Sequence, residues 1–456
     1  MSLRPSATQG IYIVKGRVNF AVKSAALEGL RLSAIPRASP SMSRTRVGVE
    51  LLRDAGWQPV ANQRSGALVH AASTLPDSLQ HTVDAMAEAR PTVNLRAIFA
   101  PEHGFRGDRQ AEHGDPQPYV DRDTGIMVHS VYRKSDTELE RLLVDLELQV
   151  VLVDIQDAGT RLYTFLWTLY SLMRAAGALR KPPRFVIADR PNPLGGVAVE
   201  GPMLNVSCCS SRYGLAPVTH RHGLTVGESA RLFAALLAQG QGAPPVEVIA
   251  LQNWRRSFLF SDTGLPWVPP SPNLPTPDVA IAYTSTVFVE ATTASEGRGT
   301  TLPFETIGAP WLNASQLVAA MQQHAGRASS SLPALPPQPQ QQWRKAYFIP
   351  TFFKYNGSAC AGAQLVRPRS LGQHSSSFTE GVRLLSALRA LGGRAHFQWD
   401  GSWFGQPGSI LIDRYAGTPR LRELLDAGAS VDDVANAFAP EAAAFAQARA
   451  KYLLYQ

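Results

Sequence analysis

The sequence predicts an α/β protein built on a parallel sheet, with a second, smaller α/β segment nearer the C-terminus. Short apolar runs at 95–100, 150–155 and 185–188 each end abruptly in a polar loop that carries acidic residues. Continuous Val, Ile and Leu runs are typical of strands buried on both faces of a parallel sheet. Because ligands bind beyond the carboxyl ends of such strands, the loops predict one acid-rich cleft.

Strand and helix patterns alternate along the first part of the chain. The strands are expected at 95–100, 125–132, 149–155, 184–189 and 246–251. Helices are expected from Ser135 and from Thr225, because each of these cap residues is followed three positions later by a glutamate that completes a capping box. Another helix is expected over 161–179, where apolar side chains recur at helical spacing. This alternation indicates right-handed βαβ units.

The second half of the chain is interrupted by a low-complexity stretch. Residues 327–345 contain a run of serines and then Pro and Gln, which predicts a linker or surface loop. Beyond it, strands are expected at 347–353 and 362–366, and helices at 377–391, 419–427 and 431–452. A chain of 456 residues usually holds more than one core. The expected parts are an extension (1–46), a parallel-sheet domain (47–326), the linker (327–345) and a smaller α/β domain (346–456).

The formal charge of +8 is concentrated at the N-terminus, because residues 1–46 contain eight Lys and Arg against one acid, Glu28. The remaining chain is nearly neutral, which removes the electrostatic support for nucleic-acid binding. The extension resembles an organellar targeting peptide, and the alternatives are a disordered extension or a true start at Met42. No apolar run is long enough for a transmembrane helix, so no membrane partner is expected.

Cysteines and histidines predict neither a metal site nor a disulfide framework. Cys208 and Cys209 are adjacent, which makes them a poor disulfide candidate, and Cys360 stands alone. No metal-ligand spacing occurs, so no metal or other cofactor is expected. No Walker sequence or GxGxxG follows a strand, and no GxSxG elbow is present, which disfavours nucleotide-dependent enzymes and esterases.

Glu102 is the strongest candidate for chemistry. It directly follows a predicted buried strand and lies between Pro101 and His103, where partial burial could raise its pKa. Glycoside hydrolysis needs such a carboxylic acid to protonate the leaving oxygen, and a second group on the other side of the anomeric carbon. The alternative is a loop glutamate that caps a neighbouring helix.

Later loops supply further candidates. Glu290 and Glu296 flank a polar stretch that ends at Arg298, whose neighbouring glycines would let the backbone approach a ligand. Arg298 could then hold a carboxylate through two hydrogen bonds, and the alternative is a surface turn. Asp157 lies in the loop after another strand and is favoured over Asp154, which falls inside the strand pattern.

Asp154 is expected to be buried with an arginine, and Arg161, Arg190 and Arg298 are the possible partners. Aromatic side chains near the loops could stack on a sugar, although most buried aromatic residues are simply core. These are Tyr163, Trp254, Trp267, Tyr283 and Trp311.

Several ordered motifs resemble the exo-β-N-acetylmuramidase (NamZ-like) family. They are PEHGFRG at 101–107, DIQDAGTRLYT at 154–164, DRPNPLGG at 189–196, VEGP at 199–202, HGLTVGE at 222–228, PSPNLPT at 270–276, SEGRGT at 295–300 and PFETIGAPW at 303–311. The resemblance covers roughly 47–456. It implies a Rossmann-like catalytic domain and a smaller C-terminal domain, with a cleft between them.

The resemblance also implies removal of N-acetylmuramic acid from the non-reducing end of peptidoglycan fragments, with Glu102 as general acid. The candidates for the second catalytic group are Glu290 and Glu296, then Asp157, and the 2-acetamido group of the substrate could serve as an internal nucleophile. The implied partner is a muramyl sugar or oligosaccharide, and the oligomeric state stays open. The candidate substrate-binding residues are His103, Asp157, Arg161, Tyr163, Arg190, Asn192, Glu200, Asn273 and Arg298.

One residue and one short segment depart from the family pattern. Thr293 stands where the family usually has Asn, which motivates a second hypothesis, a binding protein that keeps the cleft without catalysis. Residues 62–66 replace a more regular strand and loop, so no strand is expected there.

Overall fold

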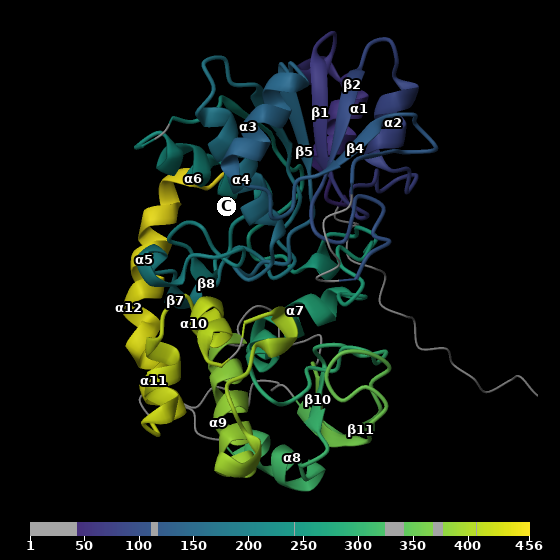
Figure 1. Cartoon of the computed structure of the whole chain (residues 1–456). Coiled ribbons are helices and arrows are strands. Elements are labelled where there is room, and N and C mark those ends of the chain that lie inside the picture. The colour runs from purple at the N-terminus through teal and green to yellow at the C-terminus, as the bar shows by residue number, and fades with distance from the viewer. Residues whose placement is uncertain (1–42, 111–116, 241, 324–341, 368–376, 407) are drawn as a thin grey trace, which may run out of the picture. The chain divides into compact units, whose positions relative to one another are not determined.

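The computed structural model describes residues 43–110, 117–240, 242–323, 342–367, 377–406 and 408–456. Nearly all of the expected extension and most of the expected linker lie outside these residues. The described helices and strands lie within the unit Arg44–Gln456 (Figure 1). Within the described ranges, no helix combines the length and the apolar character needed to cross a bilayer.

A seven-stranded sheet has the strand order β3-β4-β2-β1-β5-β6-β9. Its strands are β1 Arg64–Val69, β2 Asn94–Ala100, β3 Tyr119–Val120, β4 Met127–Ser130, β5 Val150–Asp154, β6 Arg184–Ala188 and β9 Val246–Ile249. All neighbours pair in parallel except the short β3, which runs antiparallel to β4. The predicted α/β class and parallel sheet are therefore confirmed.

The expectation of no strand at 62–66 is wrong, because β1 starts at Arg64 and lies between β2 and β5. A Cβ at Gly66 would lie 2.7 Å from the ring of Phe99 and 2.9 Å from Leu148. The glycine therefore lets two core side chains pack against the backbone, and a residue typical of turns is used in a central strand.

Helices cover both faces of this sheet. They are α1 Gly48–Asp54, α2 Thr82–Glu88, α3 Asp136–Asp145, α4 Phe165–Gly177 and α6 Val226–Leu237. Val151 and Val153 of β5 belong to the core that also holds side chains of α3, α4 and α6, whereas Val150 and Leu152 belong to the core that holds side chains of α1 and α2. The helices expected from Ser135 and Thr225 are confirmed with their capping boxes.

The C-terminal part is built on a second, three-stranded antiparallel sheet with the order β10-β12-β11. Its strands are β10 Thr306–Ala309, β11 Gln342–Phe348 and β12 Cys360–Val366. Its helices are α7 Pro277–Thr286, η3 Val287–Ala291, α8 Ala314–Gln323, α9 Ser377–His396, η5 Ser402–Phe404, α10 Ile410–Ala416, α11 Arg420–Asp426, α12 Val431–Arg449 and η6 Ala450–Tyr452. The remaining elements are η1 Gln58–Val60, β7 Glu200–Met203, α5 Val206–Cys209, β8 Thr219–Arg221 and η2 Phe260–Asp262.

The strand expected at 347–353 differs from the observed β11. That strand ends at Phe348, and residues 350–357 form a loop in which the N–H of Gly357 donates to the carbonyl of Pro350. Pro350 has no N–H to donate to a sheet ladder, which explains why the strand does not continue. The loop brings Phe353 and Lys354 toward residues 289–298.

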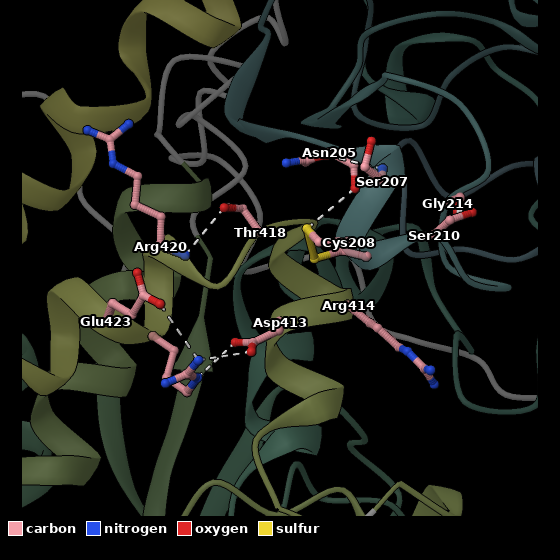
Figure 2. Close-up of a disulfide and its surroundings, with 12 residues drawn as sticks. Asn205, Ser207, Cys208, Ser210, Gly214, Asp413, Arg414, Thr418, Arg420 and Glu423 are labelled. Atoms are coloured by element: carbon pink, nitrogen blue, oxygen red, sulfur yellow. Dashed lines mark hydrogen bonds and ion pairs between the residues drawn. A yellow bond between two sulfur atoms is a disulfide. The ribbon is translucent and has the colours of Figure 1, made fainter.

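The expectation that Cys208 and Cys209 are unbonded is wrong, because the structure has a disulfide between them (Figure 2). Both residues belong to the single turn of α5, which lies against the end of α10 through a hydrogen bond from the N–H of Asn205 to the carbonyl of Gly417. Cys208 is exposed and Cys209 is buried. Cys360 is free, and burial raises the pKa of its thiol to about 11.

Candidate active site

A pocket lies where the loops after β2 and β5 meet residues of the C-terminal part. Its lining residues are Glu102, His103, Leu162, Tyr163, Thr164, Tyr213, Ser271, Leu274, Tyr283, Glu290, Arg298, Phe304, Phe404 and Tyr415. The structure therefore brings together Glu102, His103, Tyr163, Glu290 and Arg298 from among the candidates.

Glu102 is held at the sheet side of the pocket. It follows the carboxyl end of β2, is half-buried, and accepts a hydrogen bond on Oε2 from the hydroxyl of Thr164 at 2.7 Å. Thr164 lies at the start of α4, in the loop that follows β5. Among the described residues, the other carboxyl oxygen has no hydrogen-bond partner, so it is available to a ligand.

His103 lines the pocket beside Glu102. Its ring is buried and its Nδ1 lies 3.1 Å from the carbonyl oxygen of Arg109. A carbonyl only accepts, so Nδ1 carries the hydrogen and Nε2 is an acceptor. Burial lowers the pKa of His103, and the negative charge of Glu102 only partly offsets this effect. The imidazole is therefore neutral at pH 7.

Tyr163 also lines the pocket, directly before Thr164. Burial raises the pKa of its phenol well above the ordinary value, so the group stays protonated. Its ring packs on Phe165 with centroids 4.6 Å apart. Its hydroxyl has no hydrogen-bond partner among the described residues, although it is buried. An unpaired buried hydroxyl is costly, which favours a ligand as its partner.

On the C-terminal side, Glu290 and Arg298 form a buried ion pair. Nε and Nη2 of Arg298 donate to Oε1 of Glu290 at 2.8 and 2.5 Å, and the hydroxyl of Tyr415 donates to Oε2 at 2.6 Å. Burial raises the pKa of Glu290, Arg298 partly offsets this, and Glu296 adds to the rise. Burial by itself would lower the pKa of Arg298, but the two carboxylates raise it, so its positive charge is secure.

Glu296 lies behind Arg298 and is not part of the pocket lining. It is buried, with Oε1 3.4 Å from Nε of Arg298 and Oε2 3.2 Å from Nζ of Lys354. The ammonium of Lys354 also lies within 2.8–3.0 Å of the carbonyl oxygens of Val289, Glu290, Thr292 and Ala294. Lys354 thus fixes the backbone that carries Glu290, a role that sequence reasoning missed because no local pattern marks this lysine.

Two family models match the chain, one for the N-terminal part of exo-β-N-acetylmuramidase NamZ over residues 66–278 and one for its C-terminal part over 281–455. The chain belongs to this family. A similar relative is the peptidoglycan β-N-acetylmuramidase NamZ of Bacillus subtilis (strain 168), 34% identical over 414 residues that cover 90% of this chain and 92% of the relative.

Two crystal structures of DUF1343 family proteins from Bacteroides fragilis share the fold. Their TM-scores are 0.76 and 0.70, and each is 26% identical to this chain. Each alignment covers 91% of this chain, together with 100% and 99% of the respective relative. The similarity spans both halves of the chain, so the family resemblance expected from the motifs is confirmed.

Several residues in the family-like motifs lie outside the pocket lining and make internal contacts. Asp154 is paired with Arg190, one of its three expected partners, through bonds of 2.5 and 2.9 Å. Arg161 is fully buried and donates to the carbonyls of Tyr213 and Tyr415, which line the pocket. Burial lowers the pKa of Arg161 to about 9.

Other candidates join loops to one another. Asp157 accepts from the N–H of Gly159 and lies 3.3 Å from Nε2 of His222. Asn192 accepts from the N–H of Leu194 and donates to the carbonyl of Leu224. These contacts indicate that both side chains shape the loops around the pocket.

Glu200 and Asn273 also make internal contacts, and neither belongs to the pocket lining. Glu200 pairs with Arg221 at 2.6 Å and accepts from the N–H of Phe378. Asn273 is buried between the lining residues Ser271 and Leu274 and donates to Gln110 at 3.1 Å. Across the described ranges, no group of three or more His, Cys, Asp or Glu side chains is arranged to hold a metal ion.

Proposed function

We propose that this chain, a glycosidase by family, releases N-acetylmuramic acid from the non-reducing end of peptidoglycan-derived glycans, with Glu102 as general acid. The observation that carries the proposal is the position of Glu102 in one pocket with the Glu290–Arg298 pair. In this arrangement Glu102 faces the leaving oxygen and Thr164 fixes its carboxyl group.

The pocket contains a cation suited to the lactyl carboxylate of muramic acid. Among the described residues that line it, Arg298 carries the positive charge, because His103 is neutral. Two nitrogens of Arg298 are engaged by Glu290, which leaves Nη1 for the substrate. We therefore assign carboxylate recognition to Arg298 rather than to Arg190, because Nε and Nη2 of Arg190 already donate to the carboxylate of Asp154.

We assign Glu290 as the second catalytic carboxylate and Glu296 as its electrostatic support. Glu290 lines the pocket, whereas Glu296 lies behind Arg298. Both oxygens of Glu290 already accept hydrogen bonds, so direct attack on the anomeric carbon would first require those bonds to break. We therefore favour the substrate's acetamido oxygen as nucleophile, with Glu290 stabilising the positive charge that develops on the sugar.

The test is release of free N-acetylmuramic acid from its β-linked disaccharide with N-acetylglucosamine. Glu102→Gln should lower kcat by about 10²–10⁴-fold, the usual contribution of a general acid. Glu88→Gln, on the exposed side of α2, is the matched control and should keep full activity. A folded wild-type protein that releases no sugar would contradict the proposal.

The alternative of a non-catalytic binding protein loses its motivation in the structure. The hydroxyl of Thr293 donates to the carbonyl of His396 and accepts from the N–H of Gln398, and Thr293 is not part of the pocket lining. The departure at this position therefore concerns a contact between two loops rather than the candidate substrate pocket.

A further inference from the structure

Trp403 exposes a large aromatic surface next to the pocket. It lies in η5, and 50% of its surface is accessible to solvent. Its ring stacks on Phe353 with centroids 5.7 Å apart and an angle of 27° between the planes. Phe404, the next residue in the chain, lines the pocket and packs on the same Phe353 ring at 5.3 Å.

Phe353 itself packs against the C-terminal side of the pocket, where Glu290 and Arg298 lie. The guanidinium of Arg298 lies 5.6 Å from the centre of its ring. The adjacent Lys354 is anchored on the carbonyls of residues 289–294, and the N–H of Thr351 donates to the carbonyl of Gly299. The stacked pair Phe353–Trp403 is therefore held in place by the residues that also hold Glu290 and Arg298.

An isolated exposed aromatic residue needs no explanation, because apolar atoms make up much of every protein surface. Tyr347 of β11 is such a case, since it is 73% exposed and does not line the pocket. Trp403 differs because its ring stacks on Phe353, which also packs on the pocket-lining residue Phe404. These contacts place the exposed indole beside a residue of the pocket lining.

We propose that Trp403, backed by Phe353, forms an aromatic platform for the sugar on the leaving-group side of the bond that is cleaved. The proposal rests on the function assigned above: exo-cleavage places one muramyl unit in the pocket, so the next sugar must lie at its mouth. A pyranose presents an apolar C–H face that matches a flat, rigid aromatic surface. The chemical class of ligand is an amino-sugar pyranose joined through its 4-oxygen.

The experiment compares two substrates that share the muramyl unit. One is the β-linked disaccharide of N-acetylmuramic acid with N-acetylglucosamine, and the other is methyl β-N-acetylmuramide, which has no second sugar. Trp403→Ala should lower kcat/KM about tenfold on the disaccharide, because an aromatic contact of this kind is worth about that factor. It should change kcat/KM on the methyl glycoside by less than about twofold. Trp403→Phe should recover most of the loss.

Binding provides a readout independent of turnover. In the Glu102→Gln background, Trp403→Ala should weaken calorimetric binding of the disaccharide about tenfold and leave binding of free N-acetylmuramic acid unchanged. Tyr347→Ala is the matched control and should alter neither.

Equal losses on both substrates would overturn the platform, since they would mean that Trp403 only supports Phe353 and Arg298. An unchanged kcat/KM of Trp403→Ala on the disaccharide would overturn the platform as well. In both cases wild-type turnover would leave the proposed function intact, whereas a wild type that cleaves neither substrate would contradict the function itself.

Discussion

On the sheet side of the pocket, Glu102 is half-buried and accepts one hydrogen bond, from Thr164. On the C-terminal side, Glu290 is buried and both of its oxygens are engaged, by Arg298 and by Tyr415. A carboxyl group with an available oxygen can exchange a proton with a ligand, whereas one locked in an ion pair contributes fixed charge. The comparison teaches that two glutamates in one pocket have different surroundings, from which the different roles proposed for them follow.

The largest expected effect separates the two carboxylates by stability. Glu290→Gln removes the main counter-charge of the buried Arg298 and should lower the free energy of unfolding by about 3–5 kcal/mol, the usual result of breaking a buried pair. Glu102→Gln keeps an acceptor for the hydroxyl of Thr164 and should change the free energy of unfolding by less than about 1 kcal/mol. Urea unfolding measures both, and equal losses would abolish the distinction.

Lys354→Met tests how the C-terminal side is held. The change leaves four carbonyl oxygens and Glu296 without the ammonium, so we expect a loss of about 3 kcal/mol in the free energy of unfolding. The matched control is Lys345→Met on the exposed face of β11, which should leave the unfolding midpoint unchanged. A midpoint for Lys354→Met equal to that of the control would contradict the anchoring role.

The sequence predicted the sheet side of the pocket better than the C-terminal side. Glu102 and His103 follow a continuous apolar strand, so a local pattern places them at the carboxyl end of the sheet. Lys354 meets Val289 and Trp403 meets Phe353 only through the tertiary fold, and neither stands in a pattern that marks it. Short motifs also drew attention to Arg190 and Asn192, whose contacts are internal.

Strand β1 and the Cys208–Cys209 disulfide were missed for local reasons. Gly66 weakens the strand pattern but allows close packing, and the disulfide joins neighbours in one helical turn. The domain limits 47–326 and 346–456 stay a prediction, although the two family models divide the chain between residues 278 and 281. Targeting by residues 1–46 stays a prediction as well.

A smaller effect tests the single contact on the sheet side. Thr164→Val removes the hydroxyl that donates to Glu102 while keeping the shape of the side chain. Glu102 becomes a carboxylate as it gives up its proton, and hydrogen bonds to charged groups are worth about 1.5–3 kcal/mol. The value of kcat/KM on the disaccharide should therefore fall at least about tenfold. Thr168→Val, one turn along α4, is the matched control and should retain kcat/KM. Equal values for the two variants would contradict positioning of Glu102 by Thr164.

The smallest effect concerns the junction between the two sides, where Nε2 of His220 donates to the carbonyl of Thr284 at 2.7 Å. Burial lowers the pKa of His220 to about 3, whereas the unfolded chain takes up this proton near pH 6.5. The unfolded state therefore binds more protons below pH 6.5, and stability falls as the pH drops toward 3. The contribution is up to about 1.4 kcal/mol per pH unit.

Urea unfolding at several pH values measures that slope. His220→Gln should show a shallower dependence between pH 6.5 and pH 5 than the wild type, because one buried titrating group is gone. Identical slopes would show that His220 does not contribute to the acid sensitivity of the fold.

The most direct test of proton donation by Glu102 compares leaving groups. A dinitrophenyl muramide departs without protonation, whereas the disaccharide needs an acid to protonate its leaving oxygen. We expect Glu102→Gln to lower kcat/KM on the disaccharide about 10²–10⁴-fold and to retain most activity on the dinitrophenyl glycoside. Equal losses on the two substrates would contradict the assignment of Glu102 as the general acid.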